Sequence, residues 1–186
     1  MALRIPALPA DQRSEEQNKL LSGIPIGGDG EPLNIFTTLV RHPELMRRWM
    51  AFGGVLLFKG RLSPQDRELL ILRTAYRCNT PYEWGQHVVI ASTAGITDEE
   101  IRRIADGPGA AGWSDHQRVL LTAADELHDE SVISDATWAA LADVYDEQQL
   151  IEVPMVVGQY HLVAFTLNSL GVEPEPGLPE FPSEAS

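Results

Sequence analysis

The sequence predicts an all-α protein, a bundle of helices, and three observations carry that prediction. Apolar residues recur three to four positions apart along most of the chain between residues 33 and 170. Stretches in which apolar and polar residues alternate, as they do in half-buried strands, are few. Asn-Gly and Asp-Gly pairs, which are typical of β-hairpin turns, are also few. We therefore expect the core to lie between helices.

The first 31 residues are expected to form an extended arm around a short helix. They mix Pro, Gly and polar residues with isolated apolar ones. Arms of this kind often cover a neighbouring subunit. Helices are then predicted over residues 33–40 and 43–58. Pro43 suits the first turn of the second helix, where its missing N–H needs no partner, and the Lys-Gly pair after residue 58 ends it.

Five further helices are predicted from residues that commonly cap helix N-termini. A Ser or Thr side chain there accepts a hydrogen bond from a backbone N–H of the first turn, which otherwise has no partner inside the helix. Gly95 is expected to end the second of these helices. The five capping residues are Ser63, Thr80, Thr97, Ser114 and Ser134.

A long apolar helix is predicted over residues 147–170, with a kink at Pro154. Residues 173–186, rich in Pro, Glu and Ser, are expected to form a disordered tail. The chain therefore divides into an N-terminal arm over 1–31, one helical domain over 32–172 and the tail.

Composition limits the functions open to the chain. Its 186 residues, 44% of them hydrophobic, suffice for one substantial core. A net charge of -13 argues against partners that need a positive field, namely nucleic acids and anionic membranes. The single cysteine, Cys78, excludes an intrachain disulfide, and no segment resembles a secretion signal or an apolar run of spanning length. We expect a cytoplasmic protein.

Glu68 and His87 are the leading candidates for an acid/base site. Two consecutive helices joined as a hairpin would bring them together across a buried seam, where neither group is stable unless it is paired. A structural ion pair of Glu68 with Arg67, Arg73 or Arg77 is the alternative. Glu83, four residues before His87, shares its helix face, but it also lies three residues after Thr80 and could complete a capping box there.

Four other residues are candidates for contacting a substrate. Tyr82 and Trp84 offer an apolar wall with a hydroxyl or indole donor, although such aromatic residues are usually core. His161 lies on the last helix, and Arg73 could hold an anion. A divalent metal held by both glutamates with His87 and His161 is a weaker alternative, so we expect no metal and no cofactor.

A faint internal repeat links two of the predicted helices. Residues 85–91 resemble residues 158–164 if one residue is inserted before the second histidine. Two related helical hairpins about a pseudo-twofold axis would account for it.

Several motifs together resemble the carboxymuconolactone decarboxylase and alkylhydroperoxidase-D superfamily over residues 34–172. The resemblance implies an all-helical bundle that assembles into homotrimers or hexamers. The family's peroxidase branch uses a Glu, a Cys-x-x-Cys pair and a His, and here Glu68 and His87 match the Glu and the His. The cysteine positions hold Thr80 and Glu83, so the dithiol is missing. The motifs are RELLIL, YEWGQH, TAGITDEEI, LLTAADELH, SDATWAAL and GQYH.

Without the dithiol, the chain lacks the second thiol that would resolve a sulfenic acid formed by peroxide. We therefore expect acid/base chemistry, either decarboxylation or isomerisation, on a small organic acid or lactone. Two alternatives stay open. Cys78 could act as a lone peroxidatic thiol, although it is most simply a small buried hydrophobe, or the helical oligomer could bind small molecules without catalysis. The acidic run over residues 125–130 is expected to be a solvated helix end without chemistry.

Overall fold

The computed structural model describes residues 2–28 and 30–182, and within them the chain is all-α, as predicted. These residues form nine α-helices, one short 3-10 helix and a single β-bridge between Ile26 and Pro32, with no strand. The helices are α1 (Glu15–Leu21), α2 (Asn34–Leu39), α3 (Pro43–Phe58), α4 (Pro64–Arg77), α5 (Pro81–Thr93), α6 (Asp98–Asp106), α7 (Asp115–Asp129), α8 (Asp135–Ala142) and α9 (Glu147–Leu170).

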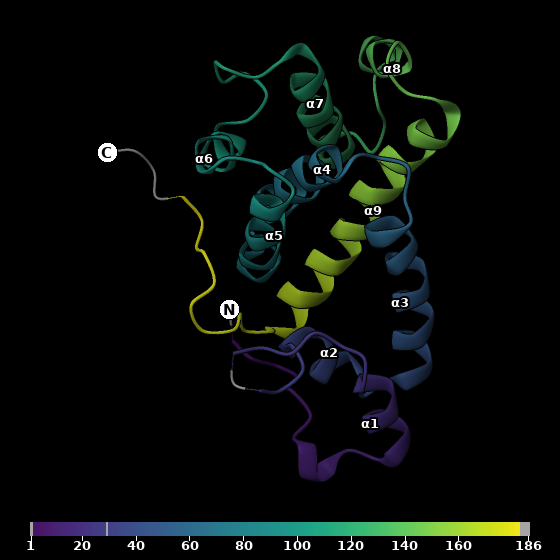
Figure 1. Ribbon diagram of the computed structural model, residues 1–186, viewed down its shortest axis with the longest axis vertical. Helices are drawn as coiled ribbons and strands as arrows, with labels where there is room; N and C mark the ends of the chain where they lie inside the picture. Colours follow the sequence, from purple (N-terminus) through teal and green to yellow (C-terminus); the bar gives the residue numbers. More distant parts are fainter. Residues whose placement is uncertain (1, 29, 183–186) are drawn as a thin grey trace.

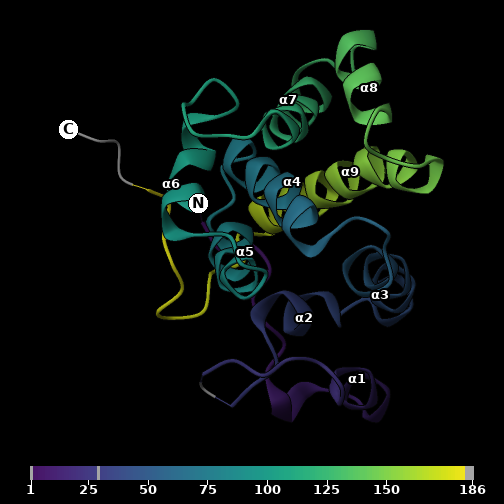
Figure 2. The ribbon, with the colours of Figure 1, turned by 45° about the horizontal axis from the view of Figure 1, so that its top comes forward.

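Helix α4 is the centre of the bundle and contacts α5, α6, α7 and α9 (Figure 1). Its residues 69–72 are four consecutive apolar side chains, and all four are almost completely buried. A helical turn that is apolar on every side needs neighbours on every side. Figure 2 shows α4 and α9 crossing the middle of the molecule, with α7 and α8 on one side and α1, α2 and α3 on the other.

Helix α9 is 24 residues long and continues through Pro154. By length and composition alone it would suffice to cross a membrane, but half of its most apolar window is buried inside this protein. It packs along α4 and α7 and therefore serves as a core helix. Its opposite side leaves a row of apolar side chains exposed: Ile151, Met155, Leu162 and Phe165.

The N-terminal arm packs on its own chain. Leu8 is buried in a small cluster with Leu21 and Met46, and its N–H donates to the carbonyl of Thr37 at 2.8 Å. The N–H of Arg4 donates to the carbonyl of Leu170, also at 2.8 Å. The part of the arm that we expected to cover a neighbour therefore closes the end of the bundle formed by α2, α3 and α9.

Residues 173–182 do not form the expected disordered tail, because they are held against α2 and α5. The Glu175 carboxylate accepts hydrogen bonds from the Asn34 N–H, the Tyr82 hydroxyl and the Gln86 amide, at 2.6, 3.0 and 2.6 Å. Phe181 packs its ring against Trp84, with ring centroids 5.3 Å apart. The rest of the predicted tail, residues 183–186, lies outside the described residues.

Four of the five predicted N-caps are confirmed, since each side chain accepts from the first turn of its helix. These are Ser63, Thr97, Ser114 and Ser134. Thr80 is the exception, because within the described part of the chain its side chain makes no cap hydrogen bond. Its hydroxyl oxygen instead accepts from the Asn168 amide of α9 at 3.1 Å.

Candidate acid/base site

The α4–α5 hairpin brings Glu68 and His87 into direct contact. Glu68 lies in the second turn of α4 on the side that faces α5, and it is fully buried. His87 lies halfway along α5, and its Nδ1–H donates to Glu68 Oε2 at 2.7 Å. Arg67 donates from Nε to the other carboxylate oxygen at 3.0 Å, so the ion pair expected as the alternative is present beside the contact with His87. Both oxygens of Glu68 are thus engaged, one by a fixed cation and one by the imidazole.

Glu83 lies on the other side of His87. It is one turn earlier on α5, and its Oε1 is 3.6 Å from His87 Nε2. Its Oε2 is buried and has no hydrogen-bond partner among the residues that the structure describes. Burial raises the pKa of Glu83 to about 7, an effect that the charge of His87 opposes and that of Glu68 increases. The alternative role of Glu83 in a capping box with Thr80 is wrong, because its carboxylate turns inward to His87.

The pKa of His87 results from opposing effects. Burial lowers it, because the charged imidazolium loses hydration, but the charge and hydrogen bond of Glu68 together with the charge of Glu83 raise it more. The net shift is upward. The Tyr160 ring stands edge-on against the imidazole, with centroids 4.9 Å apart and an interplanar angle of 88°. This ring limits the imidazole to the orientation that joins the two glutamates.

The three side chains form a line of carboxylate, imidazole and carboxyl in which protons can move. Glu68 fixes the proton on His87 Nδ1 and stabilises the imidazolium. His87 Nε2 is left facing Glu83, whose pKa lies near neutral pH. Groups with such pKa values exchange protons efficiently at the pH of most cells. The arrangement suits general acid/base catalysis.

Tyr82 and Trp84 direct their polar atoms away from this line. The Tyr82 hydroxyl donates to Glu175 and accepts from the Ile35 N–H, and the Trp84 indole donates to the Glu180 carbonyl at 3.0 Å. Both rings are buried beneath the C-terminal segment. The structure gives them a role in attaching that segment.

Arg73 is also occupied elsewhere. Its guanidinium donates two hydrogen bonds to the Asp125 carboxylate of α7, at 2.7 and 2.9 Å, and another to the Ile104 carbonyl at 2.8 Å. Asp125 belongs to the run that we expected to be solvated and inert, so that expectation is wrong at this position. An arginine satisfied in this way joins α4 to α6 and α7.

Arg67 is the arginine that sequence reasoning did not single out for binding. It lines a cavity of about 390 Å³ at the surface between the start of α4 and the end of α5. The same side chain contacts Glu68, so it links the cavity to the acid/base site. The other lining residues are Ser63, Pro64, Gln65, Ile90, Thr93 and Ala94.

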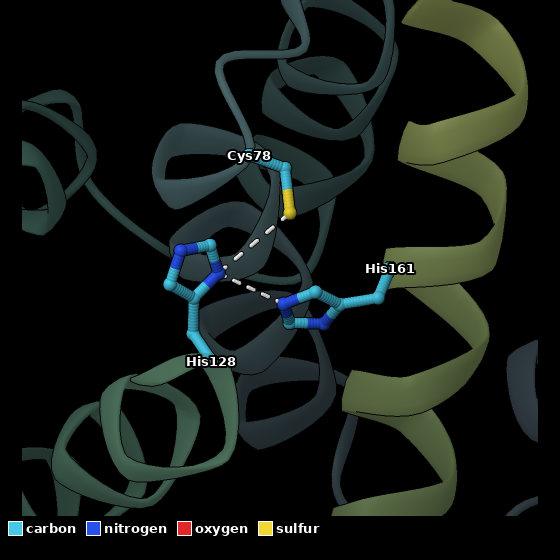
Figure 3. A group of neighbouring side chains, drawn as sticks. All are labelled: Cys78, His128 and His161. Carbon is cyan, nitrogen blue, oxygen red and sulfur yellow. Dashed lines mark hydrogen bonds between the residues drawn. The ribbon is translucent and has the colours of Figure 1, made fainter. Parts of the chain in front are cut away.

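His161 does not join Glu68, Glu83 and His87, and the four-residue metal set considered above is not assembled. It contacts His128 instead, with His161 Nε2 2.9 Å from His128 Nδ1. Cys78 Sγ lies 3.8 Å from the same His128 nitrogen (Figure 3). Sequence reasoning missed His128 because it is 50 residues from Cys78 in the chain and 33 from His161, and no local pattern joins them.

The sequence resemblance is confirmed by comparison with known proteins. Residues 43–126 match the model of the carboxymuconolactone decarboxylase family. This region includes Glu68, Glu83 and His87 and ends within α7. No curated protein matches the chain.

Solved structures share the fold over nearly the whole chain. An uncharacterised peroxidase-related protein from Silicibacter sp. TM1040 superposes with a TM-score of 0.79 at 17% identity, covering 96% of each chain. Another from Ralstonia eutropha JMP134, described as an alkylhydroperoxidase AhpD core, gives 0.75 at 21% identity, covering 94% of this chain and 95% of that one.

A third similar structure has a named activity. The debrominase Bmp8, solved as a variant with 2,3,4-tribromopyrrole, gives a TM-score of 0.74 at 11% identity, covering 95% of this chain and 94% of that one. At these identities the three likenesses show a common fold, and a common fold does not imply a common chemistry.

Proposed function

We propose, from the match of residues 43–126 to the carboxymuconolactone decarboxylase family, that the chain is an acid/base enzyme acting on a small organic acid or lactone. The reaction is a decarboxylation or an isomerisation. The observation that carries this proposal is the line from Glu68 through His87 to Glu83, in which His87 Nδ1 is fixed at 2.7 Å and Nε2 faces a carboxyl with a pKa of about 7.

Each member of the line has a distinct task. His87 moves the proton at Nε2, and Glu68 keeps Nδ1 protonated and stabilises the positive imidazolium. Glu83 supplies or receives a proton at Nε2. In a decarboxylation the bond to the departing carboxylate breaks, its electron pair forms an enolate, carbon dioxide leaves, and the imidazolium protonates the carbon. A positioned acid of this kind contributes about 10²–10⁴-fold to a rate.

Glu83 occupies one of the two positions at which the peroxidase branch of the superfamily carries a cysteine. A buried carboxyl there cannot be oxidised as a thiol is, but it can exchange a proton with His87. This replacement supports acid/base chemistry in preference to a thiol cycle.

Arg67 is the group best placed to hold a substrate carboxylate. It lines the cavity beside the site and already contacts Glu68. A substrate anion bound there would contact Arg67, which joins the cavity to Glu68. Arg73, which we expected to hold an anion, is unsuitable for that role because it is paired with Asp125.

Turnover on a panel of lactones and β-keto acids tests the proposal. We expect His87→Gln to lower kcat by about 10²–10⁴-fold on any substrate that the wild type converts. Glu83→Gln should also lower kcat, and Arg67→Gln should mainly raise KM for anionic substrates. His116→Gln is the matched control, since His116 lies on α7 against Asp66 and Tyr145. Full activity in His87→Gln would contradict the proposal.

The lone-thiol oxidoreductase is less well supported. Cys78 is the only cysteine of the chain. Burial and the charge of Glu83 raise the pKa of its thiol to about 11, although the charge of Arg77 opposes them, so little reactive thiolate forms at neutral pH. We expect the protein, supplied with dithiothreitol, to consume hydrogen peroxide no faster than dithiothreitol alone. Fast consumption would favour the thiol mechanism instead.

The same panel of lactones and β-keto acids distinguishes the enzyme from a protein that only binds small molecules. A protein that only binds would show saturable ligand binding, for example by calorimetry, without product from any substrate. Binding that depends on Arg67 together with turnover that depends on His87 would support the enzyme.

A further inference from the structure

We propose that Cys78, His128 and His161 form a metal site that binds one Zn²⁺ ion. The three side chains come from three different elements and direct one ligand atom each to a common point (Figure 3). Cys78 is the residue that ends α4, His128 lies near the end of α7 and His161 lies in the middle of α9. This site is separate from the line of Glu68, His87 and Glu83.

The ligand atoms lie near the spacing that a tetrahedral ion requires. Zn²⁺ binds sulfur at about 2.3 Å and imidazole nitrogen at about 2.0–2.1 Å, which places neighbouring ligand atoms roughly 3.3–3.6 Å apart. Here the two histidine nitrogens are 2.9 Å apart, and the sulfur is 3.8 Å from His128 Nδ1. All three ligand atoms lie within 4.8 Å of one another. Small side-chain rotations would complete the geometry.

Hydrogen bonds to neighbouring residues fix the orientation of His161 and the backbone of Cys78. His161 Nδ1 is 2.8 Å from the Val157 carbonyl, to which it donates, and this bond turns the lone pair of Nε2 toward His128. A histidine ligand is commonly oriented in this way by a hydrogen bond from its other nitrogen. The backbone of Cys78 is fixed as well, since its carbonyl accepts from the Asn168 amide at 2.9 Å.

The donor set and the local charge suit zinc. One thiolate and two imidazoles form a ligand set that suits Zn²⁺ better than Mg²⁺ or Ca²⁺, since both of those ions favour oxygen ligands. On binding, the S–H bond of Cys78 breaks, the S–Zn bond forms and the proton leaves to solvent. Arg77 is the nearby positive charge, and it is paired with Asp125 and Asp129 at 2.8 and 2.6 Å.

Three protein ligands leave the fourth position of a tetrahedral ion for water or another small ligand. All three residues are only partly buried, so solvent and the ion have access to the site. An open position of this kind distinguishes the proposed site from closed structural zinc sites, which have four protein ligands.

Cobalt titration of the wild-type protein tests the proposal directly. Co²⁺ takes the place of Zn²⁺ and makes a thiolate ligand visible as a charge-transfer band in the near ultraviolet, with the strong visible bands of a tetrahedral ion. We expect both signals to saturate at one Co²⁺ per chain and to disappear when Zn²⁺ is added. A wild-type protein that shows no thiolate band would overturn the proposal, whatever the variants do.

Variants then identify the ligands. Cys78→Ser should remove the charge-transfer band, and His128→Gln and His161→Gln should each weaken Co²⁺ binding by about tenfold or more. His116→Gln and His87→Gln should bind Co²⁺ as the wild type does, and the second of these separates the metal site from the acid/base site. Circular dichroism checks that each variant is folded. Undiminished binding in folded His128→Gln or His161→Gln would show that the metal is held elsewhere.

Discussion

A buried imidazole is normally neutral, and His87 shows what is needed to reverse that preference. Glu68 is even more deeply buried, Arg67 donates to one of its carboxylate oxygens, and the other oxygen accepts from His87. The charge of a fixed carboxylate at 2.7 Å then outweighs the loss of hydration of the imidazolium. The positive charge of Arg67 opposes this effect, because it lowers the pKa of His87.

We predict that Glu68→Gln lowers the pKa of His87, because the amide removes the charge that favours the imidazolium. The pH profile of turnover should move to lower pH with it. Histidine titration by NMR measures the shift. Asp66→Asn, two residues earlier on α4, is the control, because Asp66 contacts His116 at 3.2 Å, and it should leave the pKa of His87 unchanged. Identical titration of His87 in wild type and Glu68→Gln would mean that the pair is not coupled.

The raised pKa of Glu83 gives a second prediction, about stability. In the unfolded chain the carboxyl loses its proton near its ordinary pKa of 4.5, whereas in the folded protein it keeps the proton until about pH 7. Between these values the folded state binds more protons, so the free energy of unfolding falls as pH rises. Glu83→Gln should remove this part of the pH dependence, on the order of 3 kcal/mol.

Urea unfolding at pH 5 and pH 8 checks this prediction. The variant should have nearly the wild-type stability at pH 5 and exceed it at pH 8. A difference between variant and wild type that is the same at both pH values would show that Glu83 ionises normally.

At the scale of the elements, the helix starts were predictable because their signals are local. Ser63, Thr97, Ser114 and Ser134 each cap a helix within three residues of themselves in sequence. The Glu68–His87 contact was predictable for a related reason, since the two residues are 19 positions apart on consecutive helices joined by a short turn.

Contacts between distant segments could not be predicted from the sequence. Glu175 is 93 residues from Tyr82, and its segment has the composition of a disordered tail, yet its carboxylate finds three donors on α2 and α5. The partner of Arg73 could not be predicted either, because Asp125 is 52 residues later in the chain. Such partners depend on how the helices pack, which spacing along one helix does not reveal.

We predict that Glu175→Gln destabilises the protein by about 1–3 kcal/mol, because hydrogen bonds to a charged group contribute more than neutral ones. Residues 173–182 should then separate from α5, with faster amide exchange in that segment. Glu173→Gln is the matched control, since Glu173 contacts Asn34 through its backbone carbonyl. Equal effects of the two substitutions on urea unfolding and on exchange would argue against the role of the Glu175 carboxylate.

At the scale of the whole molecule, α9 presents a surface that one chain leaves uncovered. Its exposed apolar residues recur at helical spacing, and Gly158 in the same row has open space where a side chain would be. Adjacent apolar side chains around a glycine allow a second helix to approach closely. The net charge of -13 on each chain opposes association, so an interface between copies needs an apolar surface of this kind.

We therefore predict a homotrimer or a hexamer built from trimers, with the exposed side of α9 at an interface between chains. Multi-angle light scattering at micromolar concentration should give three or six times the 20.5 kDa mass of one chain. Leu162→Glu should lower the measured mass, because Leu162 is 51% exposed in one chain and would bury a charge in the interface. Val132→Glu, in the loop after α7 and 60% exposed, should leave the mass unchanged. A wild-type mass of one chain at every concentration would refute the assembly. An assembly mass of Leu162→Glu equal to that of the wild type would show that the interface does not include this side of α9.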